Sequence, residues 1–407
     1  MSIRRTRLFS AALAFAFTVA AAPWSQAAQD QWLASWAGPT RDPGAAGVVY
    51  AANTTVRDTV WATLGGSKVR VKFTNAYGAA PLVIGTASVG VKSAEASVFP
   101  ASLRALTFGG HAGVTVPQQG VVLSDPVDLD VPDMTDLSVS VYLPNGAGTS
   151  ATFPASLKPT YVYAGGDATM QATFTPTSTD NASGYFLSSV EVLSAKGAGV
   201  VAAVGDSITQ GVGATVQNDR WSDRLAARVQ SLSEPHHMGV LGLGIAGNRV
   251  LSGATTNPSA LARFDRDVLG MAGLTHVILA DGINDLGSTA LTATPLAPPT
   301  AEDVQYGLKQ LVERAHARGI RVIGTTMGPA WGFRGYENVE SKRLAFNAWM
   351  RTEGVKLLDG LVDFDAVLRD PANPSHMRPE FLTDGIHPNN AGHQAMADAV
   401  NLLLFRP

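Results

Sequence analysis

An apolar strand that ends in a tight glycine turn is the most restrictive feature of this 407-residue chain. Residues 200–204 read Val-Val-Ala-Ala-Val, and Gly205-Asp206-Ser207 follows directly. A segment compatible with a helix begins soon afterwards, at Arg220. In open α/β sheets, ligands bind in the crevice at the carboxyl ends of the parallel strands. The hydroxyl of Ser207 is therefore predicted to point into such a crevice, in the position of a nucleophile.

The remainder of the chain after about residue 198 alternates strand, loop and helix. Such alternation predicts a parallel sheet covered by helices on both faces. The expected strands are 200–204, 237–243, 276–280, 321–325 and 361–364. The expected helices are 220–232, 260–269, 301–318, 339–355 and 391–404.

The region before residue 195 has a different rhythm. Short runs alternate apolar and polar residues, which is typical of half-buried strands, and Gly, Pro, Asn and Asp separate them. Strands are expected at 59–64, 69–73, 82–84, 86–91, 121–123 and 137–143, and a loop or crossing segment is expected at 175–184. We predict an all-β sandwich or jelly-roll-like domain over residues 29–195, followed by an α/β domain over residues 196–407.

The first 28 residues have the pattern of a secretory signal peptide. Arg4, Arg5 and Arg7 precede the apolar run Leu8–Ala22, and small residues allow cleavage near Ala27 or Ala28. An uncleaved anchor is the alternative. No other segment reaches about 18 unbroken apolar residues. The sequence therefore predicts a mature protein that is secreted or periplasmic in a bacterium and has no membrane partner.

Composition excludes several kinds of chemistry. The chain has no cysteine, which excludes disulfides, thiol catalysis and cysteine-metal sites. The net charge of −3 and the lack of a basic stripe argue against nucleic acid as a partner. The pair His236-His237 has no third ligand clustered with it, so no metal site is predicted. We expect no cofactor, and the sequence predicts no particular oligomeric state.

Four short motifs follow expected strands or precede the last expected helix, so they lie on one rim of the sheet. They are Gly205-Asp206-Ser207, residues 244–248 (Gly-Ile-Ala-Gly-Asn), residues 282–285 (Gly-Ile-Asn-Asp) and residues 384–388 (Asp-Gly-Ile-His-Pro).

These motifs supply the groups that acyl transfer requires. Ser207 needs a base, which His387 can provide, and Asp384 can orient the imidazole and stabilise its charged form. An oxyanion needs fixed donors, and the backbone N–H groups of Ser207 and Gly247 and the side-chain amide of Asn284 can converge there. Each residue also has a simpler interpretation: Ser207 and Asp384 as helix caps, His387 as a surface residue and Asn284 as a turn residue.

Together the four motifs resemble those of the SGNH (GDSL-type) hydrolase family, over roughly residues 198–407. The resemblance implies a flavodoxin-like three-layer fold, a Ser207–His387–Asp384 triad and an oxyanion hole from Ser207, Gly247 and Asn284. The first motif continues with Ile208 where the family name has leucine. Gly242 stands where many members have an asparagine.

The N-terminal region is similar to that of bacterial secreted two-domain SGNH esterases. The similar segments are Trp36-Ala37, residues 73–78 and 124–127, Arg220-Trp221, residues 247–249 and residues 363–365. That group is associated with carbohydrate esterases, including xylan deacetylases.

The resulting hypothesis is an exported serine esterase that removes short acyl groups, with acetyl as the first choice, from carbohydrate. Trp331, Phe333, Arg220 and Trp221 are candidate substrate-binding residues, although each could instead serve packing. One alternative is a general or lipid esterase, an arylesterase or a thioesterase with the same triad. Another is a polysaccharide-binding protein with a degenerate hydrolase domain.

Overall fold

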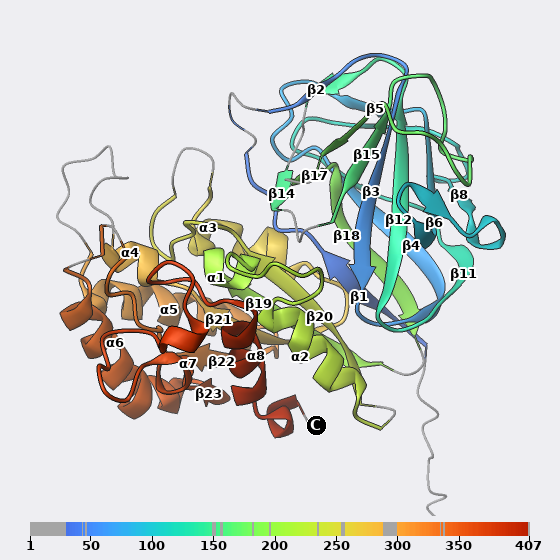
Figure 1. The fold of residues 1–407 in the computed structure, drawn as a ribbon. Helices are drawn as coiled ribbons and strands as arrows, with labels where there is room; N and C mark the ends of the chain where they lie inside the picture. The colour runs from blue at the N-terminus through green and yellow to red at the C-terminus, as the bar shows by residue number, and fades with distance from the viewer. Residues whose placement is uncertain are drawn as a thin grey trace, which may run out of the picture.

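The computed structural model describes residues 30–405 except 43, 45–46, 149–151, 155–157, 181–182, 195–196, 234–235, 254–256, 288–298, 334 and 337. The predicted signal peptide lies outside the described residues. Figure 1 shows a strand-rich N-terminal region beside a C-terminal α/β region. The last strand of the first region, β18, ends at Ser194, and the first strand of the second, β19, begins at Gly197.

Antiparallel sheets build the N-terminal region, as the sequence predicts. One sheet has the order β1-β18-β4-β10, with β11 also on β4, and a second has the order β16-β15-β3-β12-β6-β7, with β8 also on β6. Smaller pairs join β13 to β2, β14 to β17 and β5 to β9. The strand bounds are β1 Gln31–Ala37, β2 Val49–Tyr50, β3 Thr54–Ala62, β4 Gly66–Thr74, β5 Leu82–Ile84, β6 Thr86–Ala94, β7 Ser97–Val98, β8 Arg104–Leu106, β9 Val114–Val116, β10 Val121–Leu123, β11 Val127–Val131, β12 Thr135–Leu143, β13 Ala147–Gly148, β14 Thr152–Pro154, β15 Thr160–Tyr163, β16 Ser178–Asp180, β17 Ser183–Tyr185 and β18 Leu187–Ser194.

Alternation along the strands explains the core of this region. In β4, Val69, Val71 and Phe73 are fully buried, whereas the residues between them are partly exposed. The prediction of a loop over residues 175–184 is wrong, because β16 pairs with the edge of β15 at Tyr161 and Thr179. An exposed edge strand of Ser and Thr has no apolar face, so it leaves no alternating signal in the sequence.

The C-terminal region is a five-stranded parallel sheet with the order β20-β19-β21-β22-β23. This is the flavodoxin-like order 2-1-3-4-5, and it confirms the predicted fold class. The strands are β19 Gly197–Gly205, β20 His237–Gly244, β21 Leu274–Ala280, β22 Arg321–Thr325 and β23 Gly360–Val362. The helices are α1 Ser207–Gln210, α2 Trp221–Gln230, α3 Ala260–Phe264, α4 Ile283–Gly287, α5 Ala301–His316, α6 Glu340–Thr352, α7 Phe364–Leu368 and α8 Asn390–Ala399.

Helices cover both faces of the sheet, as Figure 1 shows. On β19, Val201 and Ala203 belong to the cluster that includes Trp221 of α2 and Met396 of α8. Ala202 and Val204 belong instead to the larger cluster that holds α3, α5 and α6 residues such as Leu308. Among the described residues, no helix combines the length and apolarity needed to cross a bilayer.

Several predicted boundaries need correction. The expected strand 361–364 stops at Val362, because the Asp363 side chain accepts a hydrogen bond from the Ala366 backbone N–H and starts α7. The expected helix 391–404 ends at Ala399 and is followed by a separate 3₁₀ turn, Leu402–Phe405. Helices α1, α4 and α7 were not predicted, since one helical turn is too short to show an apolar period.

The N-terminal region covers one edge of the parallel sheet. The Thr63 hydroxyl accepts a hydrogen bond from the Val240 backbone N–H at 3.0 Å and lies 3.3 Å from the Val240 carbonyl oxygen. The Ala34 N–H donates to the Ala272 carbonyl at 2.9 Å. A Cβ at Gly239 would lie only 2.2 Å from the Ala34 carbonyl oxygen, so glycine is needed where β1 meets β20.

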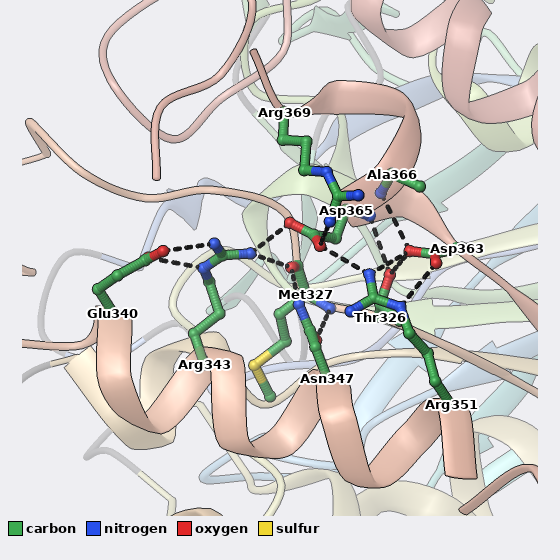
Figure 2. A network of polar contacts seen from close by, with 10 residues as sticks. All are labelled: Thr326, Met327, Glu340, Arg343, Asn347, Arg351, Asp363, Asp365, Ala366 and Arg369. Atoms are coloured by element: carbon green, nitrogen blue, oxygen red, sulfur yellow. Dashed lines mark hydrogen bonds and ion pairs between the residues drawn. The ribbon is translucent and has the colours of Figure 1, made fainter. Parts of the chain in front are cut away.

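A network of polar and charged residues with a buried centre joins α6 to the ends of β22 and β23 (Figure 2). Arg343 and Asp365 are both fully buried, and the Arg343 guanidinium bonds the Asp365 carboxylate at 2.5 Å. Asp365 also accepts from Arg351 and Arg369, at 2.7 and 3.0 Å. The segment 363–365 is thus fixed by two arginines of α6 and by Arg369, which directly follows α7.

We expect Arg343→Met to lower the free energy of unfolding by about 3 kcal/mol, because it leaves a buried carboxylate with fewer partners. Lys356→Met is the matched control, since it removes a cation from an ion pair whose Lys356 side chain is 65% exposed and should cost less than about 1 kcal/mol. Urea unfolding followed by circular dichroism measures both. Equal losses for the two variants would contradict the assigned role of Arg343.

Candidate active site

The turn after β19 positions Ser207. A Cβ at Gly205 would lie 2.3 Å from the Thr209 hydroxyl oxygen and 2.4 Å from the Ala280 carbonyl oxygen, so only glycine fits there. Asp206 caps α1, because its side chain accepts from the Ile208 N–H at 2.9 Å. Ser207 is therefore the first residue of α1, at the carboxyl end of the interior strand β19.

Ser207, His387 and Asp384 form a continuous chain of hydrogen bonds. The Ser207 Oγ lies 2.9 Å from His387 Nε2, and His387 Nδ1 lies 2.7 Å from Asp384 Oδ2. The other oxygen of Asp384 accepts from the His387 backbone N–H at 3.0 Å. In this arrangement the imidazole can remove the proton of the hydroxyl, and the carboxylate can stabilise the imidazolium that results.

The carboxylate of this chain is held in its charged form. Burial acts to raise the pKa of Asp384, but the hydrogen bonds from the His387 side chain and backbone outweigh it and hold the pKa below its usual value. His387 is buried apart from a small exposed fraction, whereas Asp384 is exposed at the surface. An ionised Asp384 is the state that orients and stabilises a protonated imidazole.

Gly247 lies in the loop after β20 with a left-handed backbone, at φ of +72°. This conformation favours glycine. Two side chains fix the preceding residue: Gln210 Oε1 accepts from the Ala246 N–H at 2.6 Å, and the Asn257 amide donates to the Ala246 carbonyl at 2.8 Å. Because Gln210 belongs to α1, this hydrogen bond connects the loop of Gly247 to the helix that begins with Ser207.

Asn284 lies on α4, after β21. Its Nδ2 donates to the Asn248 carbonyl at 2.8 Å. The neighbouring Asp285 accepts from the backbone N–H groups of Val250 and Leu251, at 2.8 and 3.0 Å. The structure thus ties α4 to the loop that carries Gly247, and the predicted oxyanion donors come from three adjoining segments.

Of the predicted substrate-binding residues, Phe333 is next to the triad. Its ring centroid lies 5.4 Å from that of His387, with the two planes at 87°. Trp331 is 44% exposed and its ring lies 6.1 Å from that of His376. Both aromatic residues belong to the loop after β22, so this loop borders the site.

The structure does not bring Trp221 to the site, and the expectation of a substrate contact there is corrected. Trp221 has 0% exposure and packs edge-on against Phe364, with centroids 5.4 Å apart. Arg220 is paired with Asp223 through two 2.7 Å hydrogen bonds. A Cβ at Gly242 would lie 3.1 Å from Arg220 Nη1, so this arginine occupies the space beside the residue where many family members have asparagine.

Three carboxyl groups are buried under the site: Asp206 and Asp285, which belong to the sequence motifs, and Asp281, which the sequence analysis did not single out. Burial, followed by repulsion from Asp206 and Asp285, raises the pKa of Asp281 well above its usual range. Burial likewise raises the pKa of Asp206 to about 7 and that of Asp285 to about 6. Since Asp281 directly follows a buried strand, the argument used for Ser207 could have identified it.

Metal binding finds no support in the part of the chain that the structure describes. No group of three or more His, Cys, Asp or Glu side chains there is arranged to hold a metal ion. In the pair His236-His237, the His237 ring contacts the Asp133 carboxylate at 3.1 Å and the Leu232 carbonyl at 2.9 Å. This histidine therefore connects the two halves of the protein.

Comparison with known proteins identifies the C-terminal region. Residues 203–395 match the profile of the GDSL-like lipase/acylhydrolase family, and this part of the chain belongs to that family. No curated protein matches the chain.

Solved structures similar to this region include three hydrolases. The aryl esterase of M. smegmatis is 17% identical over 50% of this chain and 96% of its own, with a TM-score of 0.40. An acetyl xylan esterase is 21% identical over 49% and 96%, with a TM-score of 0.37. A GDSL-like lipase from Bacteroides thetaiotaomicron is 19% identical over 50% and 84%, with a TM-score of 0.35.

We expect Asp281→Asn to change how stability depends on pH. A carboxyl group whose pKa is raised on folding stabilises the native state at low pH, and this contribution is lost as pH rises above the unfolded value. The variant has no such group to lose. The difference in free energy of unfolding, variant minus wild type, should therefore be more positive at pH 8 than at pH 4.5. Urea unfolding at both pH values measures this, with the exposed Glu353→Gln as control. An unchanged difference at the two pH values would count against a raised pKa.

Proposed function

We propose that this protein hydrolyses esters through Ser207 as nucleophile, His387 as general base and acid, and Asp384 as the orienting carboxylate. Membership of the acylhydrolase family makes the C-terminal domain an ester hydrolase. The observation that carries the assignment of residues is the unbroken hydrogen-bond chain of 2.9 and 2.7 Å from Ser207 Oγ to Asp384. All three side chains are present, which argues against a degenerate hydrolase that only binds polysaccharide.

The proposed first half-reaction forms an acyl-enzyme. Ser207 Oγ attacks the ester carbonyl carbon while His387 Nε2 takes its proton, and the carbonyl π electrons move to the oxygen. The N–H groups of Ser207 and Gly247 and the Asn284 amide are the proposed donors to this oxyanion. As the tetrahedral intermediate collapses, the ester C–O bond breaks and His387 returns the proton to the leaving alcohol.

In the second half-reaction water takes the place of the alcohol. His387 removes a proton from water, whose oxygen attacks the acyl carbon, and a second tetrahedral intermediate forms. Its collapse breaks the bond to Ser207 Oγ, which regains a proton from His387. The products are the free acid and the original enzyme, and every proton passes through His387.

The proposed substrate is a short acyl ester, acetyl first, on carbohydrate. The similarity of the N-terminal sequence to carbohydrate esterases supports this choice.

We expect Ser207→Ala to lower kcat by at least about 10⁴-fold, because the variant cannot form the acyl-enzyme. The assay measures acetate release from acetylated xylan and other acetylated glycans, beside p-nitrophenyl acetate, butyrate and longer esters. Ser67→Ala, far from the triad, is the control and should keep full activity.

The pattern of substrates then decides between the alternatives. Release of acetate from a glycan that depends on Ser207 supports the carbohydrate esterase. Cleavage of simple, aryl, thio- or long-chain esters alone would replace it with a general esterase, arylesterase, thioesterase or lipase. No activity above the Ser207→Ala level would contradict the esterase and favour the binding protein.

We further propose that the protein is exported and that its first 27 or 28 residues are removed. Expressed from Met1 in a bacterial host, the protein should appear in the periplasm or medium with Ala28 or Gln29 at its amino terminus. Mass spectrometry of the purified protein measures this. Recovery of the intact chain in the membrane fraction would show an uncleaved anchor instead.

A further inference from the structure

Tyr336 makes a short hydrogen bond to the amide that is proposed to bind the oxyanion. The Tyr336 hydroxyl donates to Asn284 Oδ1 at 2.5 Å, and Tyr336 is only 7% exposed. Tyr336 lies at the end of the loop after β22, more than fifty residues from Asn284 in sequence, and no motif includes it. The folded chain alone brings these two residues together, and the Tyr336 hydroxyl has no role in the proposed reaction so far.

This bond, with a second one, determines how the Asn284 amide is oriented. Nδ2 donates one of its two hydrogens to the Asn248 carbonyl at 2.8 Å. A flipped amide would place Oδ1 against that carbonyl oxygen, so the observed orientation is strongly favoured. With Oδ1 bound by Tyr336, the second Nδ2 hydrogen remains for an oxyanion. Donation to Oδ1 also polarises the amide and makes Nδ2 a better donor.

The hydroxyl of Tyr336 stays protonated, as a donor must. Burial, with repulsion from the carboxyl group of Asp206, raises the pKa of Tyr336 to about 12. The phenol therefore keeps its hydrogen throughout the pH range in which an esterase of this type is assayed. Its effect on Asn284 should be the same at every pH in that range.

Packing holds the Tyr336 ring in this position. A Cβ at Gly287 on α4 would lie 2.2 Å from the Tyr336 ring, so the absence of a side chain there admits the ring. The ring also packs edge-on against Phe333, with centroids 5.2 Å apart, and Phe333 in turn contacts the His387 ring. One loop thus touches both the proposed base and the proposed oxyanion donor.

We propose that Tyr336 is a positioning residue that fixes and polarises the Asn284 amide for the oxyanion. This inference rests on the proposed esterase function. An oxyanion exists only in the tetrahedral intermediate and the transition states around it, so the interaction should act on kcat and leave KM unchanged.

The test begins with Tyr336→Phe, which removes one oxygen and keeps the ring. Loss of a direct oxyanion donor costs about 10²- to 10³-fold in kcat, so loss of its support should cost less, about 5- to 20-fold. With p-nitrophenyl acetate, the ratio of wild-type to variant kcat should be constant from pH 6 to pH 9. Tyr306→Phe is the control, since Tyr306 is exposed on α5.

A double-mutant cycle separates positioning from a merely structural role. Asn284→Ala and Asn284→Ala/Tyr336→Phe should have the same kcat, because Tyr336 acts through Asn284. In addition, Tyr336→Phe should weaken a trifluoromethyl ketone, whose adduct with Ser207 carries an oxyanion, by the same factor as kcat/KM. The proposal would be overturned if Tyr336→Phe lowered kcat by the same factor in the Asn284→Ala background as in wild type. Unchanged affinity for the inhibitor would also overturn it.

Two further outcomes are distinguishable. If wild type has no activity above Ser207→Ala, the esterase function fails and this inference fails with it. If wild type is active but Tyr336→Phe raises KM or lowers Tm with kcat unchanged, the esterase stands and Tyr336 is only a packing residue.

Discussion

The register of β19 with its two neighbouring strands is the constraint on which the rest of the site depends. Gly205 at the end of β19 is level with Gly244 on β20 and Ala280 on β21. The loops that carry Ser207, Gly247 and Asn284 therefore leave the sheet from one row. A shift of one residue in either pairing would move these loops by about 3.3 Å relative to each other, which is more than a hydrogen bond tolerates.

Near the ends of these strands the protein buries carboxyl groups, whose charged form water would otherwise stabilise. Burial raises the pKa of both Asp206 and Asp281, and repulsion from Asp206 raises the pKa of Asp281 further. Arg263, also buried, donates to the carbonyl oxygens of Gly205 and Leu243 at 3.2 and 2.9 Å and lowers the pKa of Asp281. The same arginine thus bonds the carboxyl ends of β19 and β20 and favours the charged form of Asp281.

Much of this arrangement could be predicted from the sequence. Strong apolar runs identified the parallel strands, and the spacing of Asp384 and His387 identified a single loop that brings both to Ser207. The fold class and the family of residues 203–395 are confirmed, whereas the roles of the site residues remain a prediction that awaits measurement. Sequence patterns succeed here because each motif adjoins an element whose period is easily recognised.

The contacts that sequence analysis missed lack such a pattern. Tyr336 lies in an irregular loop, and only the folded chain brings its hydroxyl to Asn284. Trp221 was a candidate for either substrate binding or packing, and its side chain packs in the core against Phe364 of α7. Polar edge strands such as β16 and one-turn helices such as α1 have no apolar period, and tertiary contacts alone decide where they form.

The N-terminal region covers the edge strand β20, and this limits how the two halves of the protein can be separated. The outer strand at the opposite side, β23, has only three residues, which limits its ability to pair with another molecule. β20 has eight residues, and β1 and Thr63 shield it. A catalytic half expressed alone would present that long strand to other copies of itself. Self-association through strand addition, rather than loss of chemistry, would then be its main failure.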